Sequence, residues 1–339
     1  MRIAVVAPPV TPLAEAQLGG AQALVADLAR ALQARGHEVR VYCAEGSHLP
    51  GLRLRTVPVA AAVARALVMP GGPVAEPLPE LRQAFERLYA LVCTDGADAV
   101  SQHSFDAEAV ELAERLPMPV VHTLHLPPIV PAMVAAARIT SRRLVTVSHA
   151  AAAAWTANGV RCEVVPNGVP DFDAGRPEVR PEAMIAGRIS PEKGTHLAVE
   201  LARRAGLRPR VFGTVYDATY ARAHGLRPEA RLARPELWSV MAGCAVTLMP
   251  VQWEEPFGLV AAESQMAGTP VVAYRRGALA EVIEEGVGGL LVDPDDEPAF
   301  LRAVAAARVL DREAVRASAR RRLSIDACAA AYERVLAAS

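Results

Sequence analysis

Two glutamates separated by seven residues are the first feature of this sequence that could do chemistry. Glu255 and Glu263 stand at the two ends of the run Glu-Pro-Phe-Gly-Leu-Val-Ala-Ala-Glu, which follows an apolar stretch ending at Pro250. Pro256 and Gly258 are typical of a turn that opens a helix, so both carboxylates could face the crevice at the carboxyl ends of parallel strands. Two fixed carboxylates could hold sugar hydroxyls there. Taken alone, the pair is better explained as ordinary acids near a helix start, which the helix dipole favours.

The backbone of the same turn offers hydrogen-bond donors. Phe257, Gly258 and Leu259 stand where the predicted helix begins, and Val260 follows them within the same motif. N–H groups at a helix start have no partner inside the helix, so they suit an anion or a polyhydroxyl ligand. The turn therefore predicts a ligand site that combines these donors with the two carboxylates.

A single lysine is the second chemical feature. Lys193 is the only lysine among the 36 basic residues, and lysine is a compact point charge where arginine is a planar fork. It ends the run Arg188-Ile-Ser-Pro-Glu-Lys, in which Ser190 is typical of a helix start, with the helix continuing through Leu201. Arg188 and Lys193 could converge on one anion, such as a diphosphate whose charge grows as a bond breaks. The alternatives are a chance lysine on a solvent-facing helix start and an ordinary Arg–Glu surface pair.

Composition limits the classes of protein to consider. The 339 residues are enough for two domains, and 52% hydrophobic residues allow large buried cores. A formal charge of −1 gives no reason to expect nucleic acid or an anionic membrane as a bulk partner. No apolar run reaches membrane-spanning length, and residues 1–9 are too short for a secretory signal. The five cysteines are scattered without metal or redox spacing, so we expect them reduced and buried in a cytoplasmic protein.

Alternating strands and helices predict a parallel α/β sheet in the first half. An apolar strand leads through a loop to Gly19-Gly20, which opens an amphipathic helix ending at Gly36. Later strands are expected at 38–42, 52–57, 97–102, 120–125 and 144–148, with helices at 81–92 and 106–116. The dehydrogenase fingerprint G-x-G-x-x-G is absent, although a Gly-Gly pair lets a backbone approach a ligand closely. A turn at 69–73 is of the kind that often determines binding specificity.

The second half repeats the alternation after a linker. The polar, proline-rich run from Pro166 to Pro181 indicates that linker. Strands are expected at 183–186, 211–213, 245–249, 271–274 and 289–292, and helices at 190–201, 235–243, 278–285, 298–308, 312–323 and 327–336. Asp171-Phe-Asp173 and Asp293-Pro-Asp295 spell D-x-D, a spacing of carboxylates that can bind a divalent metal ion. We interpret both as turn carboxylates.

Taken together, the motifs resemble the donor-site signature of the retaining glycosyltransferases of family GT4. The resemblance rests on Gly19-Gly20, the Pro-Asn-Gly-Val run from Pro166, the Gly-Arg run from Gly187, and Glu-x7-Glu followed by Ala-Gly-Thr-Pro. It covers nearly the whole chain in the right order. The run Pro-Val-Gln-Trp-Glu from Pro250 is most similar to the antibiotic-pathway branch typified by the avilamycin glycosyltransferase.

The resemblance implies the GT-B fold, in which two facing Rossmann-like domains with parallel sheets enclose an interdomain cleft. The first, acceptor-side domain would comprise residues 1–168 plus 324–339, because the last helix of such proteins returns to it. The second domain, residues 169–323, would bind a nucleotide-sugar donor, with a UDP-sugar favoured. No divalent metal and no other cofactor is expected, since the fold uses cationic side chains instead.

The resemblance also assigns roles to residues. Glu263 would hold the ribose hydroxyls and Glu255 the transferred sugar, while Leu232 would lie near the nucleotide base. Arg188 and Lys193 would hold the diphosphate. Gly19, Gly20 and the turn from Phe257 to Val260 would complete the donor site.

A strand-end histidine completes the assigned residues. His125 follows a predicted strand, a usual place for site chemistry, and it matches the GT4 histidine that reaches toward the donor sugar. A lone histidine is more often structural, and we expect His122 on the same strand to be so. Together with Arg188, Lys193 and Glu255, His125 is our candidate catalytic set.

Other hypotheses stay open at this point. One keeps the fold but changes the reaction to that of a sugar-nucleotide epimerase or phosphorylase; another is a degenerate nucleotide-sugar-binding protein; the last is a dehydrogenase. Where the family usually has Glu-Ala-Met-Ala, this chain has Glu263-Ser-Gln-Met, which puts the packing of that helix in question. The hydroxyl acceptor is not apparent from the sequence. Arg138, Arg142 and Arg143 share a predicted helix that could touch a membrane surface, but a solvated helix face explains them better.

Overall fold

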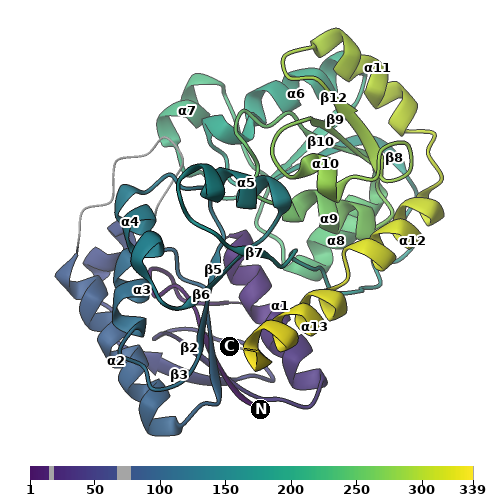
Figure 1. Cartoon of the computed structure of the whole chain (residues 1–339). Helices are drawn as coiled ribbons and strands as arrows, with labels where there is room; N and C mark the ends of the chain where they lie inside the picture. Colours follow the sequence, from purple (N-terminus) through teal and green to yellow (C-terminus); the bar gives the residue numbers. More distant parts are fainter. Residues whose placement is uncertain (15–18, 67–77, 339) are drawn as a thin grey trace. The chain divides into compact units, whose positions relative to one another are not determined.

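The computed structural model describes residues 1–14, 19–66 and 78–338 (Figure 1). Contacts divide the chain into two units, the first comprising Met1–Asn167 with Ile325–Ser339 and the second Gly168–Ser324. The domain division that the sequence predicts differs from these units by one residue at each crossing. The predicted turn at 69–73 lies outside the described residues.

Unit 1 is built on a parallel sheet whose described strands follow the order β3-β2-β1-β4-β5-β6-β7. The strands are β1 (Arg2–Val6), β2 (Glu38–Ala44), β3 (Arg53–Val57), β4 (Ala99–Gln102), β5 (Val120–Leu124), β6 (Arg143–Thr146) and β7 (Glu163–Val164). In the register Val6 lies beside Tyr42 on one side and beside Gln102 on the other, so the carboxyl ends of β1, β2 and β4 share one edge.

Helices cover both faces of this sheet. They are α1 (Gly20–Ala34), α2 (Pro79–Asp95), α3 (Ala107–Ala113), α4 (Pro131–Ile139), α5 (His149–Ala157) and α13 (Ile325–Ala337), with the 3₁₀ helix η1 (Ala61–Ala66). Side chains alternate along β1: Ile3 and Val5 pack with α1 and α13, whereas Ala4 and Val6 pack with α2 and α3. Figure 1 shows the returning helix α13 beside α1.

Unit 2 has its own parallel sheet, with its described strands in the order β12-β11-β10-β8-β9. The strands are β8 (Arg180–Ala186), β9 (Arg208–Phe212), β10 (Cys244–Met249), β11 (Val271–Tyr274) and β12 (Gly289–Val292). The helices are η2 (Pro191–Lys193), α6 (Thr195–Arg204), α7 (Ala218–Ala223), α8 (Arg234–Gly243), α9 (Leu259–Met266), α10 (Leu279–Val282), α11 (Glu297–Ala307) and α12 (Arg312–Arg322). β8 lies between β10 and β9, so the loop after β8 lies beside the loop after β10 at the edge where the strands end.

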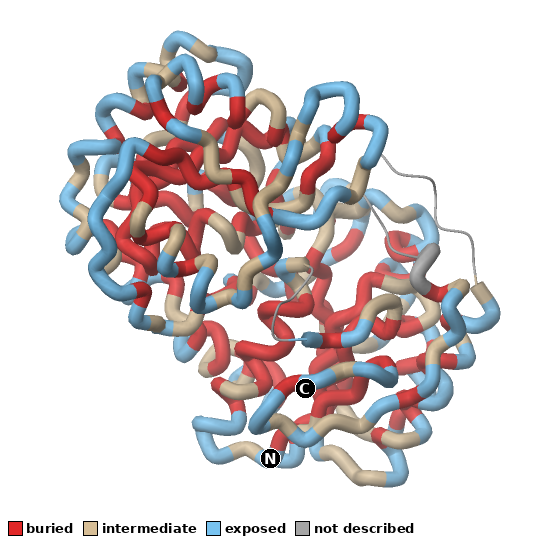
Figure 2. The backbone as a smooth tube through the Cα atoms, turned by 180° about the vertical axis from the view of Figure 1, so that it is seen from behind, coloured by how far each residue is buried: buried red, intermediate tan, exposed pale blue. Residues whose placement is uncertain are grey.

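The core of unit 2 also lies on both faces of its sheet. Ala183 and Ile185 of β8 pack with α6, α7 and α11, whereas Met184 between them packs with Trp238 of α8. Figure 2 shows buried backbone in the interior of each unit, with exposed segments around it. Two parallel sheets covered by helices on both faces agree with the Rossmann-like architecture that the sequence predicts.

Three helix predictions need correction. The predicted helix containing Arg138, Arg142 and Arg143 ends at Ile139, because Thr140 and Ser141 turn the chain into β6. Arg142 instead donates to the carbonyls of residues 114, 116 and 118. The helix expected at 190–201 is interrupted by Gly194, and the one expected at 278–285 is a single turn, α10.

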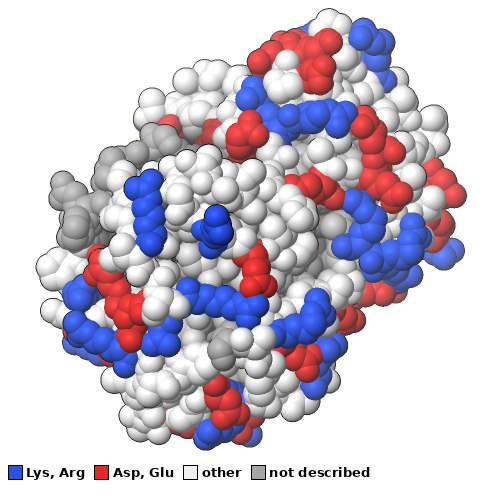
Figure 3. Space-filling model, viewed as in Figure 1, with Lys and Arg blue, Asp and Glu red and all other residues white. Residues whose placement is uncertain are grey.

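Charged side chains of both signs are interleaved over the face shown in Figure 3. Exposed pairs such as Arg35–Glu333 and Arg275–Glu285 join many of them. Such exposed pairs add little stability individually. Of the cysteines, Cys43, Cys244 and Cys328 are buried as expected, whereas Cys93 is exposed and Cys162 half-buried; all five are free.

Candidate functional site

Two loops at the carboxyl edge of the second sheet bring most of the predicted site residues together. The loop after β8 contains Arg188 and Lys193, and the loop after β10 contains Glu255. β8 and β10 are neighbours in the sheet. A backbone hydrogen bond of 2.8 Å from the Gln252 N–H to the Glu192 carbonyl joins the two loops. This edge is where open parallel sheets bind ligands.

Lys193 and Glu255 are in direct contact. The lysine Nζ lies 2.6 Å from Glu255 Oε2, and the Trp253 indole N–H donates to the same oxygen at 2.8 Å. Glu255 is buried, and the Lys193 side chain is 20% exposed. Lys193 is therefore not the solvent-facing residue that the sequence suggested, because its ammonium is turned inward to a buried carboxylate. Both donors contact Oε2, and no hydrogen bond to the second carboxylate oxygen, Oε1, is present among the described residues.

Arg188 lies between aromatic rings in the same place. Its guanidinium carbon is 5.9 Å from the centre of the Tyr216 ring and 5.8 Å from that of Trp253. The guanidinium also pairs with Glu192 at 3.3 Å, so the predicted alternative of an Arg–Glu pair is present as well. Because Lys193 Nζ is 5.0 Å from the same Trp253 ring, this ring lies against both cations.

Gly194 makes this arrangement possible. Its φ of 62° is a left-handed conformation, and a Cβ there would lie 2.2 Å from the Pro250 carbonyl oxygen. Only glycine combines that conformation with so close a backbone approach. Gly194 therefore separates η2 from α6 and brings the Lys193 turn against the loop after β10.

Glu263 lies on α9 and has a different partner. Its Oε1 accepts from Arg234 Nε at 2.9 Å and lies 2.8 Å from the second guanidinium nitrogen. The Arg234 guanidinium in turn lies 4.9 Å from the centre of the Trp238 ring. Leu232 and Val260 both pack on the cluster that contains Trp238. Glu263, Leu232 and Val260 thus gather around Arg234 and Trp238.

The turn that opens α9 has the predicted form. Gly258 precedes the helix with a φ of 94°, and α9 begins at Leu259. Phe257 and Gly258 are buried, while Leu259 is half-buried. The helix ends before Gly268, as the Gly-Thr-Pro pattern predicts. The substituted residues Ser264 and Gln265 are both buried; Ser264 Oγ and Gln265 Nε2 are hydrogen-bonded, whereas Gln265 Oε1 has no partner among the described residues.

His125, Gly19 and Gly20 belong to unit 1. His125 follows β5 and is buried, and its Nε2 lies 3.0 Å from Nδ1 of His103, which follows β4. Burial lowers the pKa of His125 to about 4 and that of His103 well below its usual value, so both rings are neutral near pH 7. Gly19 precedes α1 in an extended conformation, and the Gln22 side chain fills the space that a Cβ would need.

The D-x-D sequences behave as turn carboxylates. Asp173 accepts from the Gly175 N–H at 2.9 Å, and Asp171 pairs with Arg320. Asp295 pairs with Arg276 at 3.7 Å. Within residues 1–14, 19–66 and 78–338, no three His, Cys, Asp or Glu side chains cluster in a way that could hold a metal ion.

Similarity to known proteins covers almost the whole chain. Residues 18–171 match the family model described as Glycosyltransferase Family 4, and residues 171–323 match the model described as Glycosyl transferases group 1. A D-inositol 3-phosphate glycosyltransferase of Acidothermus cellulolyticus is 30% identical over 366 aligned positions, which cover 86% of this chain and 78% of that protein. The chain belongs to glycosyltransferase family 4.

Shorter matches join it to other members of the family. A D-inositol 3-phosphate glycosyltransferase of a Nocardioides species is 32% identical over 202 residues, covering 48% of this chain and 43% of that protein. One of Nocardiopsis dassonvillei is 42% identical over 88 residues, covering 24% and 20%. The aligned part therefore spans less than half the length of these two relatives.

Solved structures confirm the GT-B fold of this family member. AviGT4, a glycosyltransferase involved in avilamycin A biosynthesis, has a TM-score of 0.70 at 21% identity and covers 100% of this chain and 98% of its own. Anabaena Alr3699/HepE in complex with UDP-glucose has a TM-score of 0.71 at 18% identity over 100% of both chains. The catalytic domain of Starch Synthase IV from Arabidopsis thaliana, bound to ADP and acarbose, has a TM-score of 0.75 at 16% identity and covers 99% of this chain and 98% of its own.

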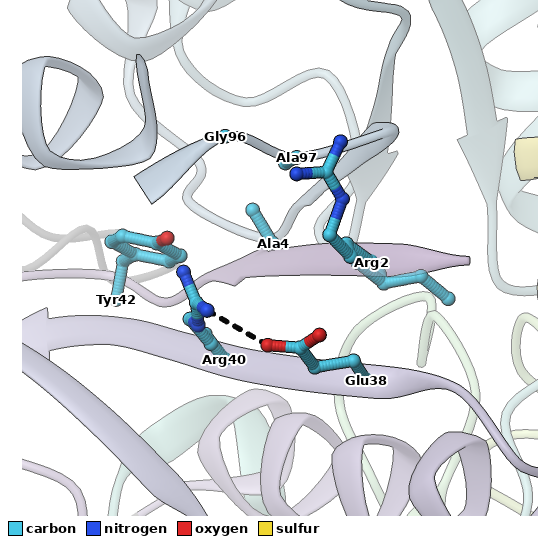
Figure 4. Close-up of a pocket in the computed structure, with 8 residues that line it drawn as sticks. Arg2, Ala4, Glu38, Arg40, Tyr42, Gly96 and Ala97 are labelled. Carbon is cyan, nitrogen blue, oxygen red and sulfur yellow. Dashed lines mark hydrogen bonds and ion pairs between the residues drawn. The ribbon is translucent and has the colours of Figure 1, made fainter. Parts of the chain in front are cut away.

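A hollow in unit 1 lies at the opposite, amino end of its strands. It is open to solvent, has a volume of only about 10 Å³ between β1 and β2, and is lined by Arg2, Glu38, Arg40 and Tyr42, among others (Figure 4). Arg40 and Glu38, which are two residues apart on β2, pair with each other at 2.7 Å. The volume is below the roughly 300 Å³ of a small-molecule site, and ligands of such sheets bind at the other end of the strands. We do not assign this hollow to the glycosyltransferase site.

Three residues that contact the predicted ones could not be assigned a role from the sequence. In the sequence, Trp253 is notable only as part of the run Pro-Val-Gln-Trp-Glu that resembles one branch of the family. In the structure it donates to Glu255 and lies against both Arg188 and Lys193. A tryptophan two residues before a candidate carboxylate is a usable signal for it. No sequence pattern singles out Arg234 or His103, because both are distant in sequence from their partners and only the fold brings them there.

Among the described helices, none has the length and apolar character needed to cross a membrane.

Proposed function

We propose that this protein is a retaining glycosyltransferase that moves a sugar from a nucleotide-diphosphate donor, with a UDP-sugar favoured, to a hydroxyl acceptor without a metal ion. The contact between Lys193 and Glu255 supports the proposal most directly. A donor has its sugar and its diphosphate on either side of one bond, so the groups that hold them must be neighbours. The two side chains are 2.6 Å apart at the carboxyl edge of the sheet.

The groups around this pair suit the two parts of such a donor. Lys193 and Arg188 would bind the diphosphate and stabilise the negative charge that grows on it as the bond to the sugar breaks. Glu255 would accept hydrogen bonds from sugar hydroxyls, using Oε1 while Oε2 stays bonded to Trp253. Glu263 would hold the ribose hydroxyls, with Arg234 fixing its orientation and Leu232 lying near the base.

The contacts of the carboxylates at the site support the stereochemical proposal. Inversion would need a protein base to activate the acceptor, and a covalent retaining route would need a protein nucleophile. In the unit 2 site Glu255 Oε2 is bonded to Lys193 and Trp253, Glu192 pairs with Arg188, and Glu263 pairs with Arg234. We therefore assign deprotonation of the acceptor to the leaving phosphate on the same face of the sugar, as in the retaining members that this sequence resembles.

The relatives suggest which compounds to test first. The solved neighbours contain UDP-glucose in one case and ADP in another. The named relatives are D-inositol 3-phosphate glycosyltransferases. UDP-glucose, UDP-N-acetylglucosamine and ADP-glucose with D-inositol 3-phosphate and a panel of simple alcohols and sugars form the starting set.

Product stereochemistry is the deciding experiment. Each donor is incubated with each acceptor, products are found by mass spectrometry, and the anomeric coupling of any product is read by NMR. An α-linked product from an α-donor supports retention, whereas a β-linked product overturns it. A sugar product that is epimerised at one carbon and forms without an acceptor would favour an epimerase. A product formed with inorganic phosphate as the acceptor would favour a phosphorylase.

Metal independence is tested on the same reaction. We expect the rate to survive EDTA, because Arg188 and Lys193 supply the positive charge that a divalent ion supplies in other transferases. The control is a metal-dependent glycosyltransferase assayed in the same buffer. Complete loss of activity restored by Mn²⁺ or Mg²⁺ would contradict the proposal.

A further inference from the structure

Three polar side chains of unit 1 form a continuous hydrogen-bonded chain. Ser101 Oγ lies 2.8 Å from His103 Nε2, and His103 Nδ1 lies 3.0 Å from His125 Nε2. Ser101 is 0% exposed, His103 1% and His125 8%, so the chain runs outward and ends at His125. The remaining ring nitrogen of His125, Nδ1, has no hydrogen-bond partner among the described residues.

The rings are held firmly in this arrangement. The His103 and His125 rings stack with centres 5.3 Å apart and planes at 27°. Tyr332 of the returning helix α13 lies 5.6 Å from His103, and its hydroxyl bonds Thr123 of β5 at 3.0 Å. Both histidine rings are neutral near pH 7, because burial lowers the pKa of each.

A neutral imidazole has one N–H, so the chain has only two possible directions. In the outward direction Ser101 donates to His103 Nε2 and His103 Nδ1–H donates to His125 Nε2. In the inward direction His125 Nε2–H donates to His103 Nδ1 and His103 Nε2–H donates to Ser101. In the inward direction Ser101 accepts from His103, and the hydroxyl proton of Ser101 then has no acceptor among the described residues. In the outward direction that proton is bonded, and only acceptor lone pairs of Ser101 are unused. Unpaired buried donors are rarer and costlier than under-used acceptor oxygens.

We propose that Ser101 and His103 are positioning residues that hold His125 as the Nδ1–H tautomer, so that its outward nitrogen is a hydrogen-bond donor. The role of that donor rests on the proposed function: it would bond an oxygen of the transferred sugar, whereas the other tautomer would offer that oxygen only a lone pair. Ser101 and His103 thus determine whether Nδ1 of His125 is a hydrogen-bond donor or an acceptor.

Nitrogen NMR of the free protein tests the tautomer without any assay of activity. Histidine is labelled with ¹⁵N, and the His125 signals are assigned by their loss in His125→Phe. We expect Nδ1 of His125 to have the shift of a protonated ring nitrogen and Nε2 that of an unprotonated one. The reverse pattern would overturn the proposal.

Variants at the two inner positions test the cause. His103→Phe removes the donor to His125, and Ser101→Ala removes the bond that sets the direction, so both should give a mixture of His125 tautomers. His103→Asn places an amide N–H near the former Nδ1 and should restore the wild-type pattern. His122, a buried histidine on β5, is the internal control and should keep its signals. An unchanged His125 pattern in His103→Phe would refute the positioning role.

Turnover measurements connect the tautomer to the reaction. We expect kcat to fall about tenfold or more in His103→Phe, the loss expected for one hydrogen bond made in the transition state, and to recover largely in His103→Asn. The proposed function and this inference fail separately. The expected NMR pattern without activity on any donor would leave the tautomer assigned and contradict the glycosyltransferase; full activity in His103→Phe would contradict its relevance to turnover.

Discussion

Lys193 Nζ and Glu255 Oε2 are 2.6 Å apart, although 62 positions separate the two residues in the chain. The proposed function assigns them to different parts of the donor, the lysine to the diphosphate and the glutamate to the sugar. Each therefore holds the other in place before any ligand arrives, which is the pre-organisation that a binding site needs. It also means that a change at either residue affects both stability and turnover.

The first prediction concerns Lys193→Ala. It removes the cation beside a buried carboxylate, so we expect the free energy of unfolding to fall by about 1–3 kcal/mol, measured by urea denaturation. It should also lower kcat more than donor affinity, because the charge on the diphosphate develops in the transition state. Lys193→Arg should recover part of both losses.

An exposed arginine supplies the control for this prediction. Arg203 lies on α6 and is exposed, so Arg203→Ala should change stability by less than about 0.5 kcal/mol and leave turnover unchanged. If Lys193→Ala is equally silent in both measurements, the lysine has neither role. A lower stability with an unchanged rate per folded molecule would leave it a structural role only.

The second prediction separates the two carboxylates. Glu263→Ala should weaken binding of UDP alone by about 1.5–3 kcal/mol in calorimetry, since a charged hydrogen bond to the ribose is lost. Glu255→Ala is the matched control: UDP affinity should change little, while turnover with a UDP-sugar should fall. Calorimetry with the opposite pattern would exchange the two roles. Equal binding of UDP by both variants and the wild type would contradict a nucleotide-binding role for Glu263.

The third prediction tests the backbone contact at Gly194. Gly194→Ala should lower stability and turnover together, because a Cβ would lie 2.2 Å from the Pro250 carbonyl and displace the Lys193 turn. Gly206 is a close control, with a φ of +70° against +62° and no atom within 4 Å of the place a Cβ would take. Gly206→Ala should cost only the roughly 1–2 kcal/mol of a left-handed alanine and leave turnover unchanged. Equal losses in urea denaturation would show that crowding at Gly194 is unimportant.

Local patterns were sufficient to predict most of the fold. The run from Glu255 to Glu263 predicts a turn followed by a short helix, because proline and glycine restrict the backbone wherever they occur, and α9 confirms it. The same reasoning fails at residues 190–201. Gly194 interrupts that helix with a left-handed φ at a point where the Pro250 carbonyl comes close to it, and such an approach depends on the packing of a distant loop.

The partners of the site residues could not be predicted for a similar reason. Arg234 reaches Glu263 across 29 positions, and His103 reaches His125 across 22. These distances are bridged by neighbouring strands and the helices between them, so no spacing rule along the chain indicates them. Sequence patterns located the candidate carboxylates and cations, while the fold determined what holds each of them.

The last prediction concerns pH and a buried histidine outside the proposed site. His122 on β5 is 1% exposed, and neither ring nitrogen has a hydrogen-bond partner among the described residues. Burial lowers the pKa of His122 to about 4, with Glu114 opposing this shift and Arg142 adding to it. Between its ordinary pKa of 6.5 and about 4, the unfolded chain binds a proton that the folded chain does not, so the stability present above pH 6.5 is lost as the pH falls through this window.

His122→Leu removes this proton-linked loss together with two unpaired polar atoms. We expect the variant to be at least as stable as the wild type at pH 7, and its advantage in free energy of unfolding to grow by about 2 kcal/mol between pH 7 and pH 5. Urea denaturation at half-unit steps of pH measures the difference. Val309→Ala, at an exposed side chain that does not titrate, is the control whose difference from the wild type should stay constant. If the advantage of His122→Leu is also constant across this range, His122 does not enter the fold as the neutral, buried ring described here.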